Sequence, residues 1–229
     1  MALLSDKDAK MVREHFAKNL KESVTLVCFT QTIACQFCRE TRQILEEVAD
    51  LSDKISLEAH NFIEDKEVAE QYGVDKIPAT VVVGTKDYGV RFYGIPSGYE
   101  FTSLIEAVVM VSREDSGLSD ATLEALEDLD EDVDIQVFIT PTCPYCPRAV
   151  VLGHQLAVAS DRITSAMVEA IEFPHLSQKY GVQGVPRSVF NETTHLEGAV
   201  PEPLFVAKLM QAVGKMTQRE FDAMLQGMR

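Results

Sequence analysis

The sequence predicts an α/β protein of two similar units, each a four-stranded mixed sheet flanked by helices. A repeat carries this prediction: Tyr72-Gly73-Val74 recurs as Tyr180-Gly181-Val182 and Ile77-Pro78 as Val185-Pro186, both 108 residues further on. Helical and β-branched patterns also follow one another in the same order in both halves, α-β-α-β-α-β-β-α. A chain of 229 residues has room for two such units.

The boundary between the units is expected near Ser116-Gly117, which gives units of residues 1–116 and 117–229. Ten acidic residues and one arginine within residues 112–134 indicate a solvated connection. The tail, residues 216–229, has no counterpart in the first unit. Its apolar residues at the spacing of a packed helix are Phe221, Leu225 and Met228.

Each unit is expected to open with a helix. Ser5 and Ser119 are candidate N-caps, because a serine hydroxyl can accept a hydrogen bond from a free amide of the first helical turn. The apolar residues expected to face the core are Met11, Val12, Phe16 and Leu20 in the first unit and Leu123, Leu126 and Leu129 in the second.

The remaining elements of each unit follow in a fixed order: a buried strand, a helix, a second strand, a short helix, a hairpin and a closing helix. In the first unit they are expected at residues 24–29, 41–49, 55–60, up to 72, 80–83 with 90–93, and 101–111. In the second they are expected at residues 133–139, 149–159, 167–171, up to 180, 188–190 with 194–196, and 204–213. Gly73 and Gly181 suit left-handed C-caps of the two short helices.

A Cys-x-x-Cys motif lies between the first strand and the next helix of each unit. Cys35 and Cys143 are expected at a helix N-terminus, where the partial positive charge lowers the pKa of a thiol. Cys38 and Cys146 lie one turn along the same helix face and can attack a mixed disulfide formed by the first thiol. The pattern therefore predicts two redox-active dithiols with Cys35 and Cys143 as nucleophiles and Cys38 and Cys146 as resolving thiols.

Residues beside the cysteines are candidates for tuning the thiols. Arg39, Arg42 and Arg148 follow the motifs and would stabilise a thiolate, although solvent-facing helix arginines explain them equally well. Pro144 and Tyr145, inside the second motif, would influence its redox potential.

A proline lies 43 residues beyond the first cysteine of each motif, and the identical spacing predicts cis bonds at Ile77-Pro78 and Val185-Pro186. A cis bond there would turn the chain toward the cysteines and leave the peptide groups of Ile77 and Val185 unpaired. Those groups could bind an extended substrate segment through main-chain hydrogen bonds.

These motifs resemble those of the protein disulfide oxidoreductases, a glutaredoxin-like family with tandem thioredoxin folds. Cys143-Pro144-Tyr145-Cys146 matches the glutaredoxin tetrapeptide and Val185-Pro186 the dipeptide that faces it, while Cys35-Gln36-Phe37-Cys38 is similar to the more variable N-terminal motif. The resemblance implies two thioredoxin-like units that exchange disulfides with protein substrates. It also implies no bound cofactor and electrons from a thiol or a thioredoxin-reductase-like flavoprotein.

The chain departs from neighbouring families in three places. It contains no tryptophan, so the thioredoxin motif is absent. Leu196-Glu197-Gly198-Ala199 offers one glycine where glutaredoxins carry the pair that holds glutathione, so the pattern does not indicate obligatory glutathione. One extra residue lies between the strand and the first motif, within Gln31-Thr32-Ile33-Ala34.

Composition narrows the partners. A net charge of −15 disfavours nucleic acid, and no apolar run approaches the roughly 20 residues that span a bilayer. The opening residues 1–8 lack a secretion-signal pattern, so a cytosolic location is expected, where paired cysteines are usually catalytic or metal-binding. Cys28 is expected to be a buried, inert thiol, with a regulatory thiol as the alternative, and the five histidines to be structural or solvent-facing.

Four matters stay open on the sequence alone. The dithiols could relay electrons to a peroxidase rather than act on many proteins. In a different class, four thiolates from two separate sheets could bind one structural zinc ion, or the chain could be a redox-inert scaffold. The direction of electron flow and the oligomeric state do not follow from the sequence.

Overall fold

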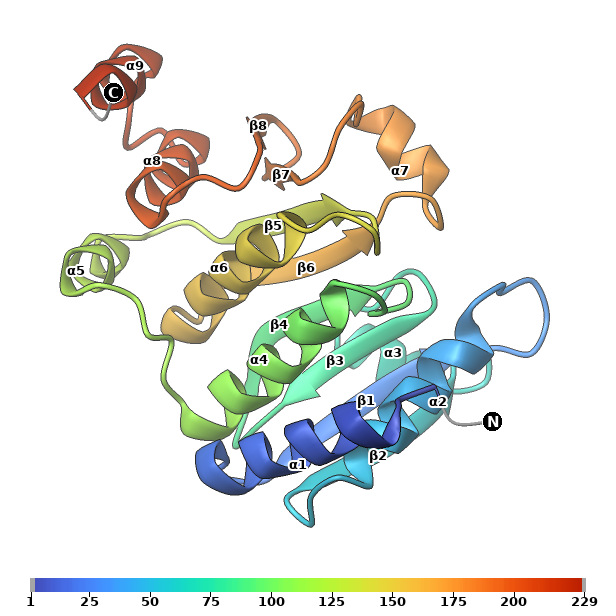
Figure 1. Cartoon of the computed structure of the whole chain (residues 1–229). Coiled ribbons are helices and arrows are strands. Elements are labelled where there is room, and N and C mark those ends of the chain that lie inside the picture. Colours follow the sequence, from blue (N-terminus) through green and yellow to red (C-terminus); the bar gives the residue numbers. More distant parts are fainter. Residues whose placement is uncertain (1–2, 228–229) are drawn as a thin grey trace.

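The computed structural model describes residues 3–227 as one mixed eight-stranded sheet with helices on both faces (Figure 1). In the first half the elements are α1 (Asp6–Asn19), β1 (Val24–Thr30), α2 (Cys38–Ala49), β2 (Ile55–Asn61), α3 (Lys66–Gln71), β3 (Ala79–Val83), β4 (Asp87–Tyr93) and α4 (Glu100–Arg113). In the second they are α5 (Asp120–Glu127), β5 (Val133–Ile139), α6 (Cys146–Ala159), β6 (Ile163–Glu169), α7 (Pro174–Lys179), β7 (Arg187–Phe190), β8 (Thr194–Glu197), α8 (Glu202–Ala212) and α9 (Gln218–Gly227).

The sheet joins the two halves. Its strand order is β2-β1-β3-β4-β6-β5-β7-β8, so each half contributes four adjacent strands. The junction is the parallel pair β4–β6, which runs from Val90 opposite Ser165 to Tyr93 opposite Val168. The expectation of two separate sheets is therefore wrong, because each four-stranded sheet satisfies the unpaired backbone groups of one edge strand with the edge of the other.

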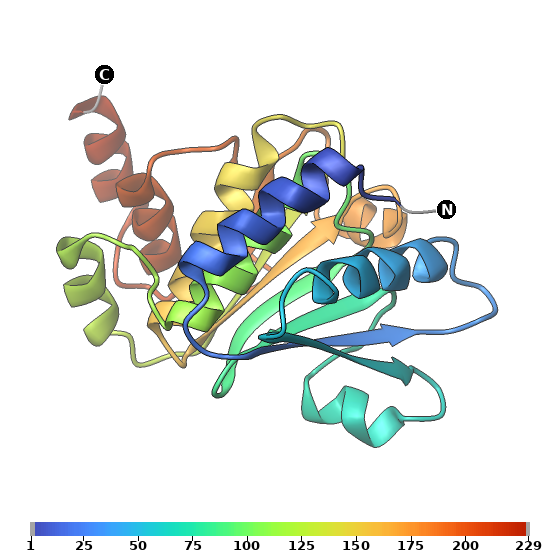
Figure 2. The same ribbon diagram turned by 60° about the horizontal axis from the view of Figure 1, so that its bottom comes forward.

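Hydrophobic side chains alternate between the two faces of the sheet, as the period of a strand requires. In β1, Val24, Leu26 and Cys28 belong to the core under the larger helices, while Val27 and Phe29 belong to the core on the opposite face. Figure 2 shows α3 on the face opposite α1, α2 and α4. Packing on both faces explains why the central strands are continuous apolar runs.

The predicted helix ends are confirmed at four positions. Ser5 Oγ accepts a hydrogen bond from the Asp8 amide at 3.2 Å, and Ser119 Oγ accepts one from the Thr122 amide at 3.3 Å. Gly73 and Gly181 follow α3 and α7 with φ of +63° and +60°, a left-handed conformation that glycine adopts without steric cost. Both predicted hairpins, β3–β4 and β7–β8, are also present.

Other sequence-based expectations are wrong in detail. The second strand of the C-terminal half begins at Ile163 rather than at residue 167, and Ile171, expected inside it, is 73% exposed. The reason is a turn, in which Glu169 Oε2 accepts hydrogen bonds from the amides of Ile171 and Glu172 and so ends the strand. Met11 and Leu123 are also exposed, because α1 and α5 each bury only one narrow face.

The connection and the tail complete the chain. The expected boundary Ser116-Gly117 lies between the end of α4 and the start of α5. In the tail, α9 buries Phe221, whose ring lies 4.3 Å from Lys208 Nζ of α8, while Met228 falls outside the described residues. No helix within residues 3–227 is long and apolar enough to span a membrane.

Candidate redox active sites

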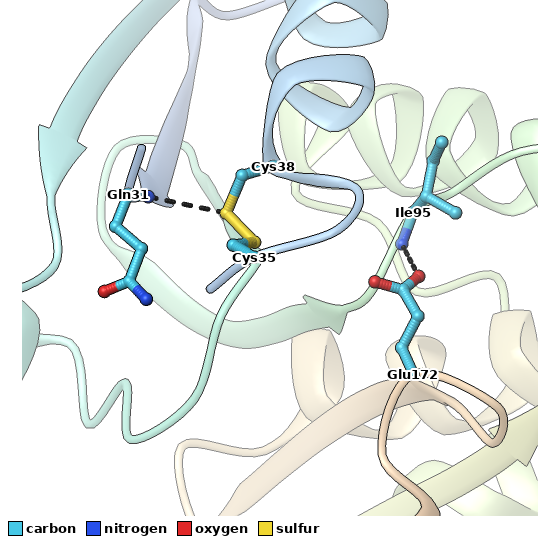
Figure 3. The surroundings of a disulfide bond; sticks show 5 residues. All are labelled: Gln31, Cys35, Cys38, Ile95 and Glu172. Atoms are coloured by element: carbon cyan, nitrogen blue, oxygen red, sulfur yellow. Dashed lines mark hydrogen bonds between the residues drawn. A yellow bond between two sulfur atoms is a disulfide. The ribbon is translucent and has the colours of Figure 1, made fainter. Parts of the chain in front are cut away.

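Each Cys-x-x-Cys motif closes a disulfide at the carboxyl end of a central strand. Cys35 pairs with Cys38 beyond β1, and Cys143 pairs with Cys146 beyond β5, with Cα–Cα distances of 5.5 Å in both cases. Figure 3 shows the first disulfide, where the Gln31 amide donates a hydrogen bond to Cys38 Sγ at 3.4 Å. Both sites therefore lie where loops leave the same edge of their sheet.

The helix starts differ from the expectation. Helices α2 and α6 begin at Cys38 and Cys146, so Cys35 and Cys143 lie in the turn before the helix rather than at its first position. The first helical hydrogen bond of α2 runs from the Thr41 amide to the Phe37 carbonyl, which fixes this start. The disulfides nevertheless hold the first sulfurs against the first helical turn, whose partial positive charge favours thiolate over thiol.

Burial separates the two cysteines of each pair. Cys38 is 3% exposed and Cys146 is fully buried. Cys35 is half-buried and Cys143 is 8% exposed, and Tyr145 between the second pair is exposed. In each pair, the first sulfur is thus the more accessible to an incoming molecule.

The prolines lie as predicted: the bonds Ile77-Pro78 and Val185-Pro186 are cis. Cys143 Sγ lies 3.8 Å from the Val185 carbonyl oxygen, so this dipeptide borders the second disulfide.

The hairpins hold both prolines in the same way. The Gly94 amide donates to the Pro78 carbonyl at 2.9 Å, and the Gly198 amide donates to the Pro186 carbonyl at 2.8 Å. Within residues 3–227 the peptide groups of Ile77 and Val185 form no backbone hydrogen bond, as expected from the sequence.

The two sites differ in their loops. The extra residue before the first motif is accommodated by Ala34 in a left-handed conformation with φ of +57°. A cavity of about 620 Å³ borders Cys35 and Cys38, and Arg39, Arg42 and His60 also line it. Arg148 instead lines a groove between α4, α6 and α8 that contains neither Cys143 nor Cys146, so it is not grouped with its dithiol as the other two arginines are.

Three buried or half-buried glutamates near the junction were not predicted from the sequence. Burial raises the pKa of Glu100, at the start of α4, to about 7, and Ser103 Oγ donates to its Oε2 at 2.5 Å. The neighbouring Tyr99 amide donates to the Pro141 carbonyl, in the loop that leads to Cys143.

The other two glutamates lie after β6. Burial, with the charge of Glu169, raises the pKa of Glu172 to about 7, and the Ile95 amide donates to its Oε1 at 2.7 Å (Figure 3). Burial also raises the pKa of Glu169. An acid in a first helical turn or a loop is an ordinary exposed pattern, so the sequence carried no signal of their burial.

The remaining thiol and the metal alternative are answered by geometry. Cys28 is fully buried in β1, and burial raises the pKa of its thiol to about 12, which makes it an unreactive core residue. The other four cysteines form two disulfides, each within one motif. Among residues 3–227 no three His, Cys, Asp or Glu side chains gather as a metal site, so the four-thiolate cluster that the zinc alternative requires does not form.

Two reversible dithiols at helix starts, each followed by a cis-proline, define the class of this protein: it is a thiol–disulfide oxidoreductase with tandem thioredoxin-like architecture. A family model described as a thioredoxin domain matches residues 133–211. A solved protein disulfide oxidoreductase from Aeropyrum pernix superposes with a TM-score of 0.87 at 30% identity, covering 95% of this chain and 97% of that one. The chain belongs to the protein disulfide oxidoreductase family.

The alkyl hydroperoxide reductases, through their flavin-type F component (AhpF), supply a second group of relatives. The NTD_N/C domain of AhpF from Enterococcus faecalis superposes with a TM-score of 0.83 at 26% identity, covering 90% of this chain and 99% of that domain. The whole AhpF protein of Xanthomonas campestris is 29% identical over 75% of this chain and 31% of its own length, and that of Escherichia coli is 26% identical over 80% and 33%. The chain thus spans about a third of the length of these curated relatives.

Proposed function

We propose that the protein exchanges disulfides with protein substrates through both dithiols, acting mainly as a reductase. The observation that carries this proposal is the C-terminal site, where Cys143 Sγ and the free peptide groups of Val185 lie side by side. A substrate segment that binds the main chain of Val185 would place its own disulfide against Cys143.

The reaction follows from the burial of the two thiols. In the reduced protein the Cys143 thiolate attacks one sulfur of the substrate disulfide, which forms a mixed disulfide and releases one substrate thiol. Buried Cys146 then attacks Cys143 Sγ, closes the protein disulfide and releases the second thiol. Two electrons pass from the protein to the substrate, and the two protons of the protein dithiol end on the substrate thiols. Cys35 and Cys38 would run the same sequence beside Ile77.

A second candidate function is an electron relay to a peroxidase. It is supported by the superposition on 99% of the Enterococcus faecalis domain, which belongs to an alkyl hydroperoxide reductase. In this proposal a flavoprotein of the thioredoxin-reductase type supplies two electrons to one dithiol, and these pass by disulfide exchange to the other dithiol and on to the peroxidase. A reducing cytosolic setting suits both candidates.

Insulin reduction in the presence of dithiothreitol tests the main proposal. We expect turbidity from the precipitating insulin B chain with the wild-type protein and with each single variant, Cys35→Ser and Cys143→Ser, and none with the double variant. Equal activity of the double variant would overturn the proposal.

The reduction potentials of the two single variants then give the direction. A value near −270 mV marks a reductase, and one near −180 mV marks an oxidase or isomerase. The relay is tested by mixing the reduced N-terminal dithiol with the oxidised C-terminal one on separate variants, where transfer slower than insulin reduction would exclude it.

A further inference from the structure

The cavity beside the Cys35–Cys38 disulfide lies on the side of the site away from the proline. Its lining comes from the ends of β1 and β2 and from the starts of α2 and α3. Since β2 lies on one side of β1 and β3 on the other, Ile77-Pro78, which precedes β3, faces the disulfide from the opposite direction. A cavity of about 620 Å³ is in the range of small-molecule sites, roughly 300–1,000 Å³.

The charged groups around this cavity favour an anion. Arg39 and Arg42 lie three residues apart on one face of α2, and both line the cavity. Arg42 donates from Nε to Glu46 Oε1 at 2.8 Å, which leaves its other guanidinium N–H groups for a ligand. No side chain caps the N-terminus of α2, so its first amides add to the positive end of the helix.

The acidic group in the cavity is engaged by its neighbours. Asp65 Oδ2 accepts from the Asn61 amide at 2.8 Å and lies 3.5 Å from His60 Nδ1. Two arginines therefore face one partnered carboxylate in a chain whose net charge is −15. The rest of the molecule repels anions, and this cavity is an exception.

The C-terminal site provides an internal comparison. The positions 108 residues beyond Arg39 and Arg42 are Pro147 and Val150, and Val150 is fully buried. The position that corresponds to Asn61 is Glu169, an acid. The two dithiols therefore share a fold but differ in charge on this side.

We infer that the N-terminal dithiol reduces small disulfides that carry carboxylates, bound in this cavity by Arg39 and Arg42. The inference rests on the proposed exchange activity and adds a substrate class for one site. The Cys35 thiolate attacks one sulfur of the bound disulfide and releases one carboxylate-bearing thiol. Cys38 then attacks Cys35 Sγ, which closes the protein disulfide and releases the second thiol, so that two electrons and two protons pass from the dithiol to the ligand.

Three disulfides of nearly equal length test this substrate class: dithiodipropionate with two carboxylates, neutral hydroxyethyl disulfide, and cystamine with two ammonium groups. The full chain carrying Cys143→Ser and Cys146→Ser is reduced, mixed with each disulfide, quenched with an alkylating reagent and followed by mass. At low ionic strength we expect dithiodipropionate to react about five- to tenfold faster than the neutral disulfide, and cystamine to react slowest. The ratio of the anionic to the neutral rate should fall toward one in high salt.

Two variants separate binding from an effect on the thiol itself. Arg39→Gln with Arg42→Gln should bring the anionic-to-neutral ratio close to one, and this ratio is independent of any change in Cys35 reactivity. Arg39→Lys with Arg42→Lys should keep most of it, because the charge remains. The C-terminal dithiol, measured in the Cys35→Ser and Cys38→Ser variant, should show no anionic preference.

Each possible failure has a distinct meaning. Equal rates with the three disulfides, or a ratio unchanged in the glutamine variant, would overturn the substrate class and leave the exchange activity standing. No reaction with any of the three would overturn the exchange activity at this site, and the substrate class with it.

Discussion

Cys143 Sγ lies 3.8 Å from the carbonyl oxygen of Val185, although 42 residues separate the two in the chain. Strands β5 and β7 are hydrogen-bonded neighbours, so the loop after one and the loop before the other meet at the same edge of the sheet. The contact places a nucleophilic sulfur beside peptide groups that have no backbone partner among the described residues. Attack and substrate binding thus occur at one point of the surface.

The buried position of Cys146 predicts a trapped intermediate. In a Cys35→Ser and Cys38→Ser background, Cys146→Ser should accumulate a mixed disulfide with insulin, because nothing then attacks the Cys143–substrate bond. Non-reducing electrophoresis measures the adduct, and dithiothreitol should remove it. Cys143→Ser is the matched control and should trap little, since the remaining thiol is fully buried. Stronger trapping by Cys143→Ser would reverse the assigned roles.

Gly98 is predicted to be essential for the loop that precedes Cys143. Its φ is +60°, and an added Cβ would collide with the Pro141 carbonyl oxygen. Gly98→Ala should lower the free energy of unfolding by about 2–3 kcal/mol and reduce C-terminal activity more than N-terminal activity. Urea unfolding and insulin reduction by single-site variants measure both effects.

Gly184→Ala is the control for Gly98, because it also lies near the second site but a Cβ there meets nothing within 4 Å. This change should alter the stability by less than about 1 kcal/mol. Equal effects of the two changes would show that the close approach to Pro141 is not what matters.

Glu100 should destabilise the protein at alkaline pH. Burial raises the pKa of this carboxyl from 4.5 to about 7, so the folded state binds a proton that the unfolded state has released. Its contribution to stability therefore falls as the pH rises from about 4.5 through 7. Glu100→Gln should be more stable than wild type at pH 8 by up to about 3 kcal/mol, and this advantage should vanish near pH 4.5.

Urea unfolding at pH 5 and pH 8 measures the effect of Glu100→Gln. Exposed Glu124 on α5 is the control position, and Glu124→Gln should leave the pH profile unchanged. An advantage of Glu100→Gln that does not depend on pH would show that the carboxyl stays charged when buried.

His154 should act in the opposite direction on the acid side. It lies on α6 with Nε2 3.2 Å from the Arg91 carbonyl oxygen of β4, and burial lowers its pKa from 6.5 to about 4. The unfolded state binds the proton first, so the stability from this group is present above about pH 6.5 and is lost as the pH falls toward 4.

His154→Gln keeps an N–H donor for the Arg91 carbonyl but cannot titrate, so it should flatten the loss of stability between pH 6.5 and pH 4. Thermal unfolding across this range measures the slope. Exposed His175→Gln is the control and should leave the slope unchanged. A steep slope in the His154→Gln variant would assign the acid sensitivity to other groups.

Much of the fold and of the site follows from local chemistry in the sequence. Cysteines three residues apart before a helical pattern, and a proline at a constant distance beyond them, identified both dithiols and both cis bonds. Ser5 and Ser119 marked helix starts because their hydroxyls bond to amides only three residues away. Signals of this kind depend on neighbours in the chain, so a sequence carries them directly.

Only the tertiary structure decided how the two halves meet. The β4–β6 junction depends on which edge strands are free, and no residue in either strand encodes its partner. The burial of Glu100 and Glu172, and the gathering of Arg39, Arg42 and His60 around one cavity beside Cys35, also arise from elements distant in sequence. Charge and burial at a site depend on everything packed against it, and that environment exists only in the folded chain.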